Sequence, residues 1–376
     1  MAFYNDLELL IDGKNAFPVI LDCIKNAKKS IYINMFIWRD DNIGNIIGEA
    51  VLEAANRGVK VDISKDKYGV VLEKSEEVKK SFFHKQQTLS EKIKYKTLEL
   101  FYPMKNTPKN GKDFETDLYL KIMHHPNINI SKDIFKADHS KYYIFDDDVL
   151  IMGGVNIEDK ENGKDFQGRF YQDYMIKFNG KEYVESFKNK YKNKEKNSVD
   201  LFYGINYKEK SNKYFEMEKL YLDMINSSKK ELTIVMAYFS PLKEFIDAIL
   251  NAHDRGVKVK ILTSKEANYQ NDSNYKTLKK LLKESNNGID VYLSPKMVHT
   301  KMIINDQYIS LGSTNITKKA FNQLDELNAF MRIENHEFVN CLFNSVEEHF
   351  NISSKVENYK ELRYNKFTAF IEGFLV

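Results

Sequence analysis

Two stretches of the chain carry the same chemically active side chains at the same spacing. Each reads His-x-Lys-x4-Asp, followed after six or seven residues by glycine and three residues later by asparagine. The chain has only eight histidines in 376 residues, so two complete matches of this pattern are not credible as chance. The motif residues are His139, Lys141, Asp146 and Asn156 in the first copy, and His299, Lys301, Asp306 and Asn315 in the second.

Imidazole, ammonium and amide groups in this pattern suit the transfer of a phosphoryl group. Residues i and i+2 of a strand face the same side, so the histidine and lysine of each motif project together. Two such halves facing each other would surround one phosphate. One histidine would attack phosphorus and form a covalent phosphohistidine, the other would protonate the leaving alkoxide, and lysine and asparagine would neutralise the developing charge. This chemistry requires no metal and no cofactor, and we predict neither.

The elements that must position these side chains are duplicated too. Residues 54–61 and 252–259 share the sequence Arg-Gly-Val-Lys-Val, and a run rich in β-branched and aromatic residues precedes each copy, at 30–36 and at 232–238. Strand, helix and strand in each half indicate parallel βαβ units and an α/β fold. We therefore predict two similar α/β/α sandwich domains related by a pseudo-twofold duplication, with the active site at their interface.

The two halves differ in length. The segment from Arg57 to His139 is nearly twice as long as the corresponding segment from Arg255 to His299. We predict that the extra sequence, at about 73–136, is an insertion that packs over the site, because long insertions in compact domains are usually functional or disordered. The predicted boundaries are a first domain at 1–190 containing this insertion, a basic linker region at 191–215 and a second domain at 216–376.

Composition argues against several classes of protein. A net charge of +3 is small for a nucleic-acid binder, so no nucleic acid is expected as a partner. The two cysteines are far apart and indicate neither a disulfide framework nor a thiolate metal site. The chain start lacks the features of a signal peptide, and no stretch approaches the ~20 apolar residues that span a bilayer. We expect a cytoplasmic protein, peripheral on the inner face of the cell membrane, and a monomer or weak oligomer.

The motifs and repeats resemble those of the phospholipase D superfamily and, more narrowly, of bacterial cardiolipin synthases without transmembrane helices. The resemblance covers most of the chain: it includes the segments 17–29 and 31–38, both Arg-Gly-Val-Lys-Val repeats, the first Gly-Gly-x-Asn and the Gln-Asp-Tyr at 172–174. It implies a phosphatidyltransferase similar to cardiolipin synthase. The expected substrate is an anionic phospholipid at a membrane surface, phosphatidylglycerol in particular.

The resemblance also implies roles for individual residues. His139 is implied to be the nucleophile and His299 the general acid. A carboxylate that follows each motif is implied to hydrogen-bond the motif imidazole and fix its tautomer. The matching positions are Asp173 for His139 and Glu326 for His299, and the second lies somewhat closer in sequence to its histidine. The motif aspartates, Asp146 and Asp306, are implied to be structural rather than in contact with phosphate.

Several alternatives stay open. If water replaces the acceptor alcohol, the same chemistry makes a phospholipase D that hydrolyses phospholipid headgroups. A nuclease or other phosphodiesterase of the superfamily is a further alternative, although relatives with one motif per chain act as dimers and this chain has two. A non-enzymatic scaffold agrees poorly with two complete motifs. Candidate membrane contacts are the insertion, the basic run 188–196 and the C-terminal segment 367–376, which ordinary packing on the second domain would also explain.

Overall fold

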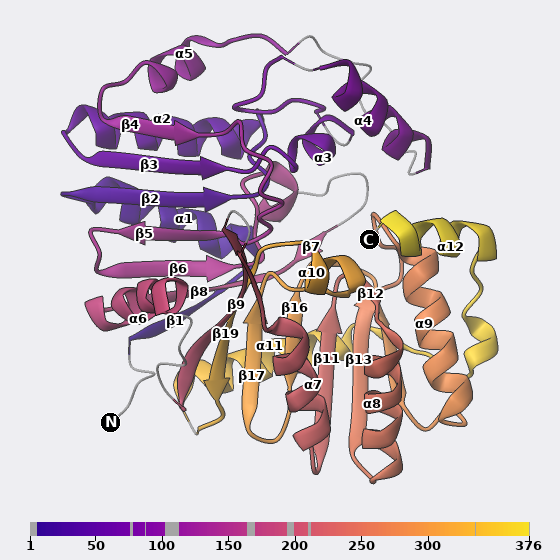
Figure 1. Cartoon of the computed structure of the whole chain (residues 1–376). Coiled ribbons are helices and arrows are strands. Elements are labelled where there is room, and N and C mark those ends of the chain that lie inside the picture. The colour runs from indigo at the N-terminus through magenta and orange to yellow at the C-terminus, as the bar shows by residue number, and fades with distance from the viewer. Residues whose placement is uncertain are drawn as a thin grey trace. The chain divides into compact units, whose positions relative to one another are not determined.

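The computed structural model describes residues 6–75, 78–86, 88–101, 113–163, 170–193, 199–209, 212–334 and 336–375. Its contacts divide the chain into two compact units (Figure 1). The N-terminal unit contains residues 10–185, and the C-terminal unit contains residues 186–376 together with 1–9. Each unit contains one of the two motifs and has its own mixed sheet.

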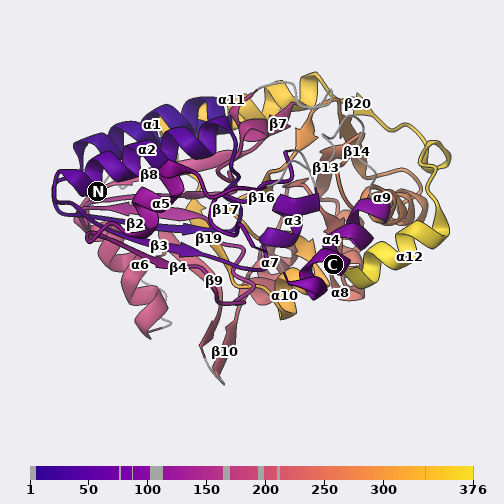
Figure 2. The same cartoon turned by 90° about the horizontal axis from the view of Figure 1, so that it is seen from above.

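The sheet of the N-terminal unit has the strand order β1-β8-β6-β5-β2-β3-β4. Its parallel part consists of β2 (Ser30–Met35), β3 (Lys60–Lys65) and β4 (Ile128–Ser131). Its antiparallel part consists of β5 (Tyr142–Phe145), β6 (Val149–Gly153) and β8 (Tyr174–Asn179). The edge strand is β1 (Leu7–Ile11), and the boundary between the units falls within it. Helices α1 (Asp12–Asn26) and α2 (Asn42–Asn56) lie side by side on one face, where they bury the apolar core (Figure 2).

The sheet of the C-terminal unit has the order β10-β9-β19-β17-β16-β11-β13-β14-β20. Its parallel strands are β11 (Glu231–Met236), β13 (Lys258–Ser264) and β14 (Asp290–Ser294). The antiparallel strands are β16 (Lys301–Ile304), β17 (Tyr308–Gly312), β19 (Glu326–Arg332), β9 (Leu201–Glu209), β10 (Asn212–Phe215) and β20 (Ser354–Lys355).

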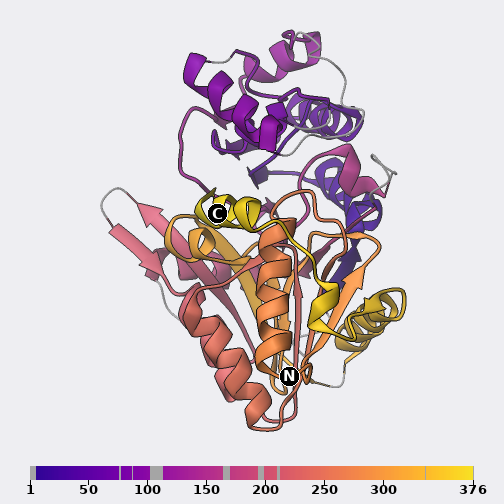
Figure 3. The same cartoon turned by 90° about the vertical axis from the view of Figure 1, so that its right-hand side faces the viewer.

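Helices cover both faces of this second sheet. The core of one face is built with α7 (Met217–Ser227), α8 (Lys243–Asp254) and α9 (Asn271–Glu284). The opposite face carries α11 (Glu337–Asn351) (Figure 2). The C-terminal helix α12 (Lys366–Leu375) packs beside the N-terminal end of α9 (Figure 3). The two units also contain helix α6 (Lys181–Asn193) and the short elements η1 (Asp159–Asn162), β7 (Tyr171–Gln172), β12 (Phe239–Ser240), β15 (Met297–Val298), β18 (Ile316–Thr317), α10 (Lys318–Asn322) and η2 (Tyr359–Glu361).

The two sheets confirm the duplication that the repeated sequence predicts. The order β8-β6-β5-β2-β3-β4 corresponds, strand by strand, to β19-β17-β16-β11-β13-β14. The central strand of each unit, β2 or β11, pairs in parallel with the strand after its helix and antiparallel with the strand at the motif lysine. The chain is therefore an α/β protein with two copies of one fold.

The extra residues of the first half lie between β3 and β4. This stretch contains α3 (Val70–Ser75), α4 (Leu89–Phe101) and α5 (Asp117–Met123), where the C-terminal unit has α9 between β13 and β14. Residues 76–77, 87 and 102–112 of the insertion lie outside the described residues. The insertion thus belongs to a crossover connection between parallel strands, which is a connection that tolerates added length.

Part of the stretch that we predicted to be a linker belongs to the second sheet. Residues 201–209 form β9, which pairs with β19, and residues 201–206 are buried. A strand that is buried on both faces has a nearly continuous apolar sequence, and most of residues 201–206 are apolar. The lysine-rich composition on either side hides this strand in the sequence. Residues 194–198 and 210–211 lie outside the described residues.

Both motif aspartates hold a segment of backbone in place. The carboxylate of Asp146 accepts hydrogen bonds from the backbone N–H groups of Lys28, Lys29 and Ser30 at 2.7, 2.7 and 2.9 Å. The carboxylate of Asp306 accepts the corresponding bonds from residues 229, 230 and 231. Each aspartate therefore connects the turn of its hairpin to the start of the central strand. The second hairpin is one residue shorter, but its aspartate makes the same contacts.

Replacing either aspartate should destabilise the fold in a pH-dependent way. Burial raises the pKa of each carboxyl, but the backbone N–H donors outweigh burial and lower it overall. We expect Asp146→Asn and Asp306→Asn each to lower the free energy of unfolding by about 1–3 kcal/mol at neutral pH. A carboxylate with a lowered folded pKa stabilises the fold above its unfolded pKa, and this contribution is lost as the pH falls through the folded pKa.

Urea unfolding followed by circular dichroism at several pH values measures this effect. The difference between wild type and each variant should shrink as the pH falls below about 4. Asp148→Asn is the matched control, since Asp148 is exposed in the same turn as Asp146. A loss of the same size in the control, or a loss that grows in acid, would contradict the assigned contacts.

Candidate active site

In the N-terminal unit, His139 and Lys141 lie in the extended segment that leads into β5. The ring of His139 meets the ring of Phe36 edge-on, with the ring centroids 4.8 Å apart. Lys141 is 0% exposed, its ammonium donates to the carbonyl oxygen of His139, and its Nζ lies 5.4 Å from the Phe36 centroid. The amide of Asn34 donates to the hydroxyl oxygen of Ser140. Ser140 thus has a different partner from the residues on either side of it, which agrees with the predicted alternation along the segment.

The C-terminal unit repeats the lysine arrangement, with an alanine in the place of Phe36. Lys301 is also 0% exposed, and its ammonium donates to the carbonyl oxygen of His299. Met236 faces the motif lysine Lys301 across the ladder between β11 and β16. In the first unit Asn34 faces Tyr142, so the register assigns Met35 to the motif lysine Lys141. The residues that follow, Ala237 and Phe36, therefore occupy corresponding positions. The two half-sites therefore share a backbone plan and differ in what packs beside the histidine.

The motif asparagines are buried at corresponding positions. Each is followed by an isoleucine that pairs in parallel with the segment after the central strand. Oδ1 of Asn315 accepts the backbone N–H of Tyr238 at 3.2 Å. Oδ1 of Asn156 is buried and has no hydrogen-bond partner within the described part of the chain. An unsatisfied buried oxygen costs about 1–3 kcal/mol, so a ligand with a donor group would be stabilised there.

Asp173 and Glu326 occupy the same place in their units. Gly153 faces Met175 across one ladder and Gly312 faces Asn328 across the other, so both carboxylates lie two positions before the partner of the motif glycine. Both are fully buried. Their unequal spacing from the motif histidines arises largely in the connection that contains η1 in the first unit and α10 in the second.

The residue after the motif glycine decides how each carboxylate packs. Asp173 lies directly on Gly154, so a methyl group added to Gly154 would overlap both carboxylate oxygens. The corresponding residue in the second unit is Ser313, whose hydroxyl donates to Glu326. Glycine thus leaves room for the aspartate in the first unit, and serine supplies a hydrogen-bond donor to the glutamate in the second.

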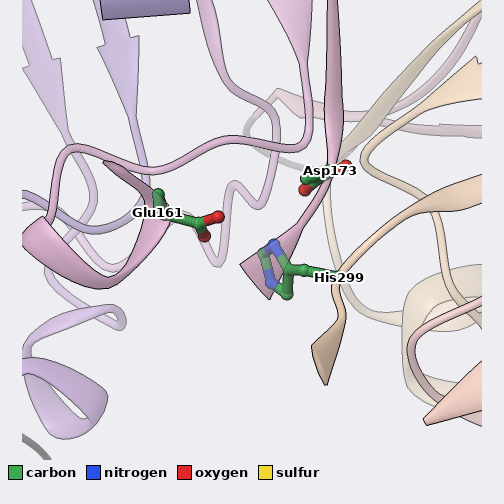
Figure 4. Close-up of side chains that lie close together, drawn as sticks. All are labelled: Glu161, Asp173 and His299. Atoms are coloured by element: carbon green, nitrogen blue, oxygen red, sulfur yellow. The ribbon is translucent and has the colours of Figure 1, made fainter. Parts of the chain in front are cut away.

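Glu161, on η1, is a neighbour of Asp173 that the sequence did not reveal. Both are buried, and oxygens of their two carboxyl groups lie within 4.8 Å of one another (Figure 4). Two carboxyl groups this close favour a shared proton or a nearby cation. Glu161 falls in a run of charged residues that reads as an exposed loop, so no sequence signal could have found it. His299, labelled in the same figure, belongs to the C-terminal unit.

Buried ion pairs hold the segment that carries Phe36. Nζ of Lys65 donates to the carbonyl oxygen of Phe36 at 2.8 Å and lies 3.0 Å from the carboxylate of Glu73. Glu73 also accepts the backbone N–H of Trp38. Arg39 pairs with Glu158 at 2.5 Å between Nε and Oε2. Except for Lys65 and Glu73, the partners in these contacts are far apart in sequence, which is why sequence analysis missed them.

Comparison with known proteins decides the family. The sequence model described as "Cardiolipin synthase, PLD-like domain" matches residues 20–194 and 221–351. The chain belongs to this family. The two matched segments carry one motif each, so the phospholipase D-like assignment made from the sequence is confirmed.

Curated relatives agree with this assignment. The chain is 25% identical to a cardiolipin synthase of Listeria monocytogenes over 352 residues, which cover 87% of this chain and 65% of that protein. It is 23% identical to cardiolipin synthase B of Salmonella typhi, covering 83% and 73% of the two chains. The chain thus spans less than two thirds of the length of the first of these relatives.

Among solved structures, phosphatidylserine synthase of Haemophilus influenzae has a TM-score of 0.69 at 14% identity, covering 98% of this chain and 92% of that one. Polyphosphate kinase of Porphyromonas gingivalis has a TM-score of 0.55 at 9% identity, covering 98% and 52%. At these identities the likeness concerns the fold. No helix in the described ranges has the length and apolar character needed to cross a membrane.

The packing of the two carboxylates yields a stability test. Gly154→Ala should lower the free energy of unfolding by about 1–3 kcal/mol, because the methyl group must displace Asp173. Ser313→Ala should cost about 1–3 kcal/mol, because it removes a donor from a buried carboxylate. Gly373→Ala is the control, since nothing lies within 4 Å of the added methyl group. Unchanged stability of Gly154→Ala in chemical denaturation would show that Asp173 does not pack on this glycine.

Proposed function

We propose that the protein transfers a phosphatidyl group from an anionic phospholipid, with phosphatidylglycerol as the expected donor, to the hydroxyl group of a second lipid. The observation that carries the proposal is the repetition, in each unit, of one set of groups. The set contains a histidine, a buried lysine bonded to the carbonyl of that histidine, a buried asparagine and a buried carboxylate. The relatives named cardiolipin synthase support this substrate class.

In the proposed reaction the two half-sites act on one phosphate. One imidazole attacks phosphorus, the bond from phosphorus to the headgroup oxygen breaks, and the second imidazole, in its protonated form, gives its proton to the leaving alkoxide. The acceptor hydroxyl then loses its proton to the second imidazole and attacks phosphorus, which releases the first imidazole. Both histidines end the cycle as they began it.

The remaining groups stabilise charge and hold the histidines. Lys141 and Lys301 are fixed by their bonds to backbone carbonyls, so they need little rearrangement as charge develops on the phosphate oxygens. The amide groups of Asn156 and Asn315 add hydrogen-bond donors. Asp173 and Glu326 each keep an imidazole in one tautomer, in the role that the family resemblance implies.

His139 is proposed as the nucleophile and His299 as the general acid. The family resemblance implies this assignment, and the packing of the His139 ring against Phe36 supports it. A ring that is held in one orientation loses less freedom when it attacks phosphorus. Ala237, a residue without a ring, stands at the corresponding position of the C-terminal unit.

A phospholipid donor requires contact with a membrane surface. We propose peripheral attachment to the inner face of the cell membrane, with the protein acting as a monomer or weak oligomer. Nucleic acid is not proposed as a substrate.

One assay separates the possible reactions. Purified protein is incubated in EDTA with phosphatidylglycerol vesicles labelled in the phosphate, and in parallel with single-stranded DNA. We expect cardiolipin and glycerol as products at an undiminished rate, because lysine and asparagine supply the charge stabilisation. His139→Asn and His299→Asn should each lower the rate by roughly 10²–10⁴-fold. His124→Asn, at an exposed histidine of the insertion, should not.

Each other product would identify another function. Phosphatidic acid as the main product would indicate a phospholipase D, and cleavage of DNA alone would indicate a nuclease. The Glu161 and Asp173 pair makes chelation an informative condition, since two close carboxyl groups suit a divalent cation. Loss of turnover in EDTA that added divalent cation restores would contradict the metal-independent mechanism.

A further inference from the structure

A groove of about 740 Å³ lies in the C-terminal unit between α8, α9 and α12. Figures 1 and 3 show these helices next to one another. Lysines dominate its charged lining, which consists of Lys243, Lys276, Lys279, Lys280 and Lys283 with one acidic residue, Glu284. The positive charge of the groove is therefore concentrated on α9.

The α9 lysines share one face of the helix. Residues 276, 280 and 283 are spaced at i, i+4 and i+7, so they point in the same general direction, while Leu278, Leu281 and Leu282 on the other face are buried in the core. Lys279 has a structural role, since its Nζ donates to the carbonyl oxygen of residue 362. The Lys280 ammonium lies 3.9 Å from Glu284 in an exposed pair, which contributes little.

Helix α12 adds exposed aromatic side chains to this basic surface. Phe367 is 70% exposed and Phe370 is 59% exposed, and Phe370 lines the groove. The helix is fixed on α9, because the 2% exposed Glu372 accepts the backbone N–H of Ser273 at 2.6 Å and Ala369 is buried. The C-terminal segment thus packs on its own unit with one face and presents phenylalanines on another.

We propose that this groove docks the protein on an anionic phospholipid membrane. The lysines bind headgroup phosphates, and the two phenylalanines enter the boundary between headgroups and acyl chains, which is the pattern of interfacial helices. The proposal rests on the proposed lipid substrate, because it is the lipid surface that combines dense negative charge with an apolar layer. Charge complementarity and the exposed aromatics together favour this partner.

The groove is also close, along the chain, to the half-site of the same unit. Ser240 lines the groove, and Tyr238, two positions earlier, donates its backbone N–H to the motif residue Asn315. The short strand β12 that contains Ser240 pairs with β18, which directly follows Asn315. A membrane docked on the groove is therefore adjacent to the strand end that holds the motif asparagine.

The basic run at 188–196 fits this role less well. Its residue Lys190 is buried and pairs with Glu216 at 2.7 Å. Lys188 and Lys192 are exposed on α6, and residues 194–196 lie outside the described residues. Lys188 and Lys192 therefore offer a matched control for a purely nonspecific effect of positive charge.

Co-sedimentation with vesicles tests the proposal. Wild type is compared with Lys276→Gln/Lys280→Gln/Lys283→Gln, with Phe367→Ser/Phe370→Ser and with the control Lys188→Gln/Lys192→Gln, after all variants are shown to melt at similar temperatures. A lysine near an anionic surface contributes about fivefold in affinity. We expect the triple variant to bind phosphatidylglycerol vesicles between about 10-fold and 100-fold less tightly, the phenylalanine variant to bind more weakly, and the control to lose less than either.

A second assay separates this proposal from the proposed function. Turnover is measured on short-chain phosphatidylglycerol dispersed in detergent, where no membrane needs to be found, and should be the same in wild type and the triple variant. If wild type binds the vesicles through these lysines but transfers no phosphatidyl group, the proposed function fails and the docking surface stands. Binding by the triple variant equal to wild type, equal binding to phosphatidylcholine vesicles, or preferential loss of single-stranded DNA binding would overturn the docking proposal.

Discussion

The burial of a lysine ammonium in each unit is the constraint on which the rest of the site depends. Moving a charged ammonium out of water costs several kcal/mol, and the hydrogen bond to a carbonyl oxygen offsets part of this cost. In both units that carbonyl belongs to the motif histidine, so the lysine also fixes the backbone that carries the imidazole. An anionic phosphate would offset more of the cost, and the same arrangement would then serve both binding and catalysis.

The extended segment that holds each lysine depends on the strands around it. It enters the sheet next to the central strand, and the motif aspartate binds the first N–H groups of that strand from the far end of the hairpin. The motif asparagine lies three residues after the end of the neighbouring hairpin strand. A shared geometry of three adjacent strands therefore explains why the motif residues have nearly the same spacing in both halves.

The two half-sites are not identical, and a reaction with one nucleophile and one acid does not require them to be. Phe36 packs on His139, whereas Ala237 takes its place in the other unit. Gly154 leaves room for Asp173, whereas Ser313 donates to Glu326. The buried Oδ1 of Asn315 is occupied by a backbone donor, and that of Asn156 is not bonded within the described residues. These differences concern the surroundings of the motif residues rather than the motifs.

Local patterns made much of the fold predictable. The repeated Arg-Gly-Val-Lys-Val, the β-branched runs and the two motifs are each short, and they were enough to predict an α/β protein built by duplication. Strand β9 was missed because lysine-rich sequence surrounds it, and the Arg39–Glu158 pair was missed because its partners are distant in sequence. Glu161 and Phe36 became visible only through tertiary contacts. Asp173 and Glu326 were predicted through the family resemblance, and strand register explains why their unequal spacing still gives equivalent positions.

The central claim is that a histidine of the first motif forms a covalent bond to phosphorus, and trapping that bond tests it most directly. Wild-type protein is mixed with phosphatidylglycerol labelled in the phosphate, quenched within the first turnovers, and mapped by peptide analysis in alkali, which preserves phosphohistidine. We predict label on the peptide that contains His139 and no label in His139→Asn. Label on His299 but not on His139 would reverse the assigned roles, and full turnover without any labelled histidine would contradict the mechanism.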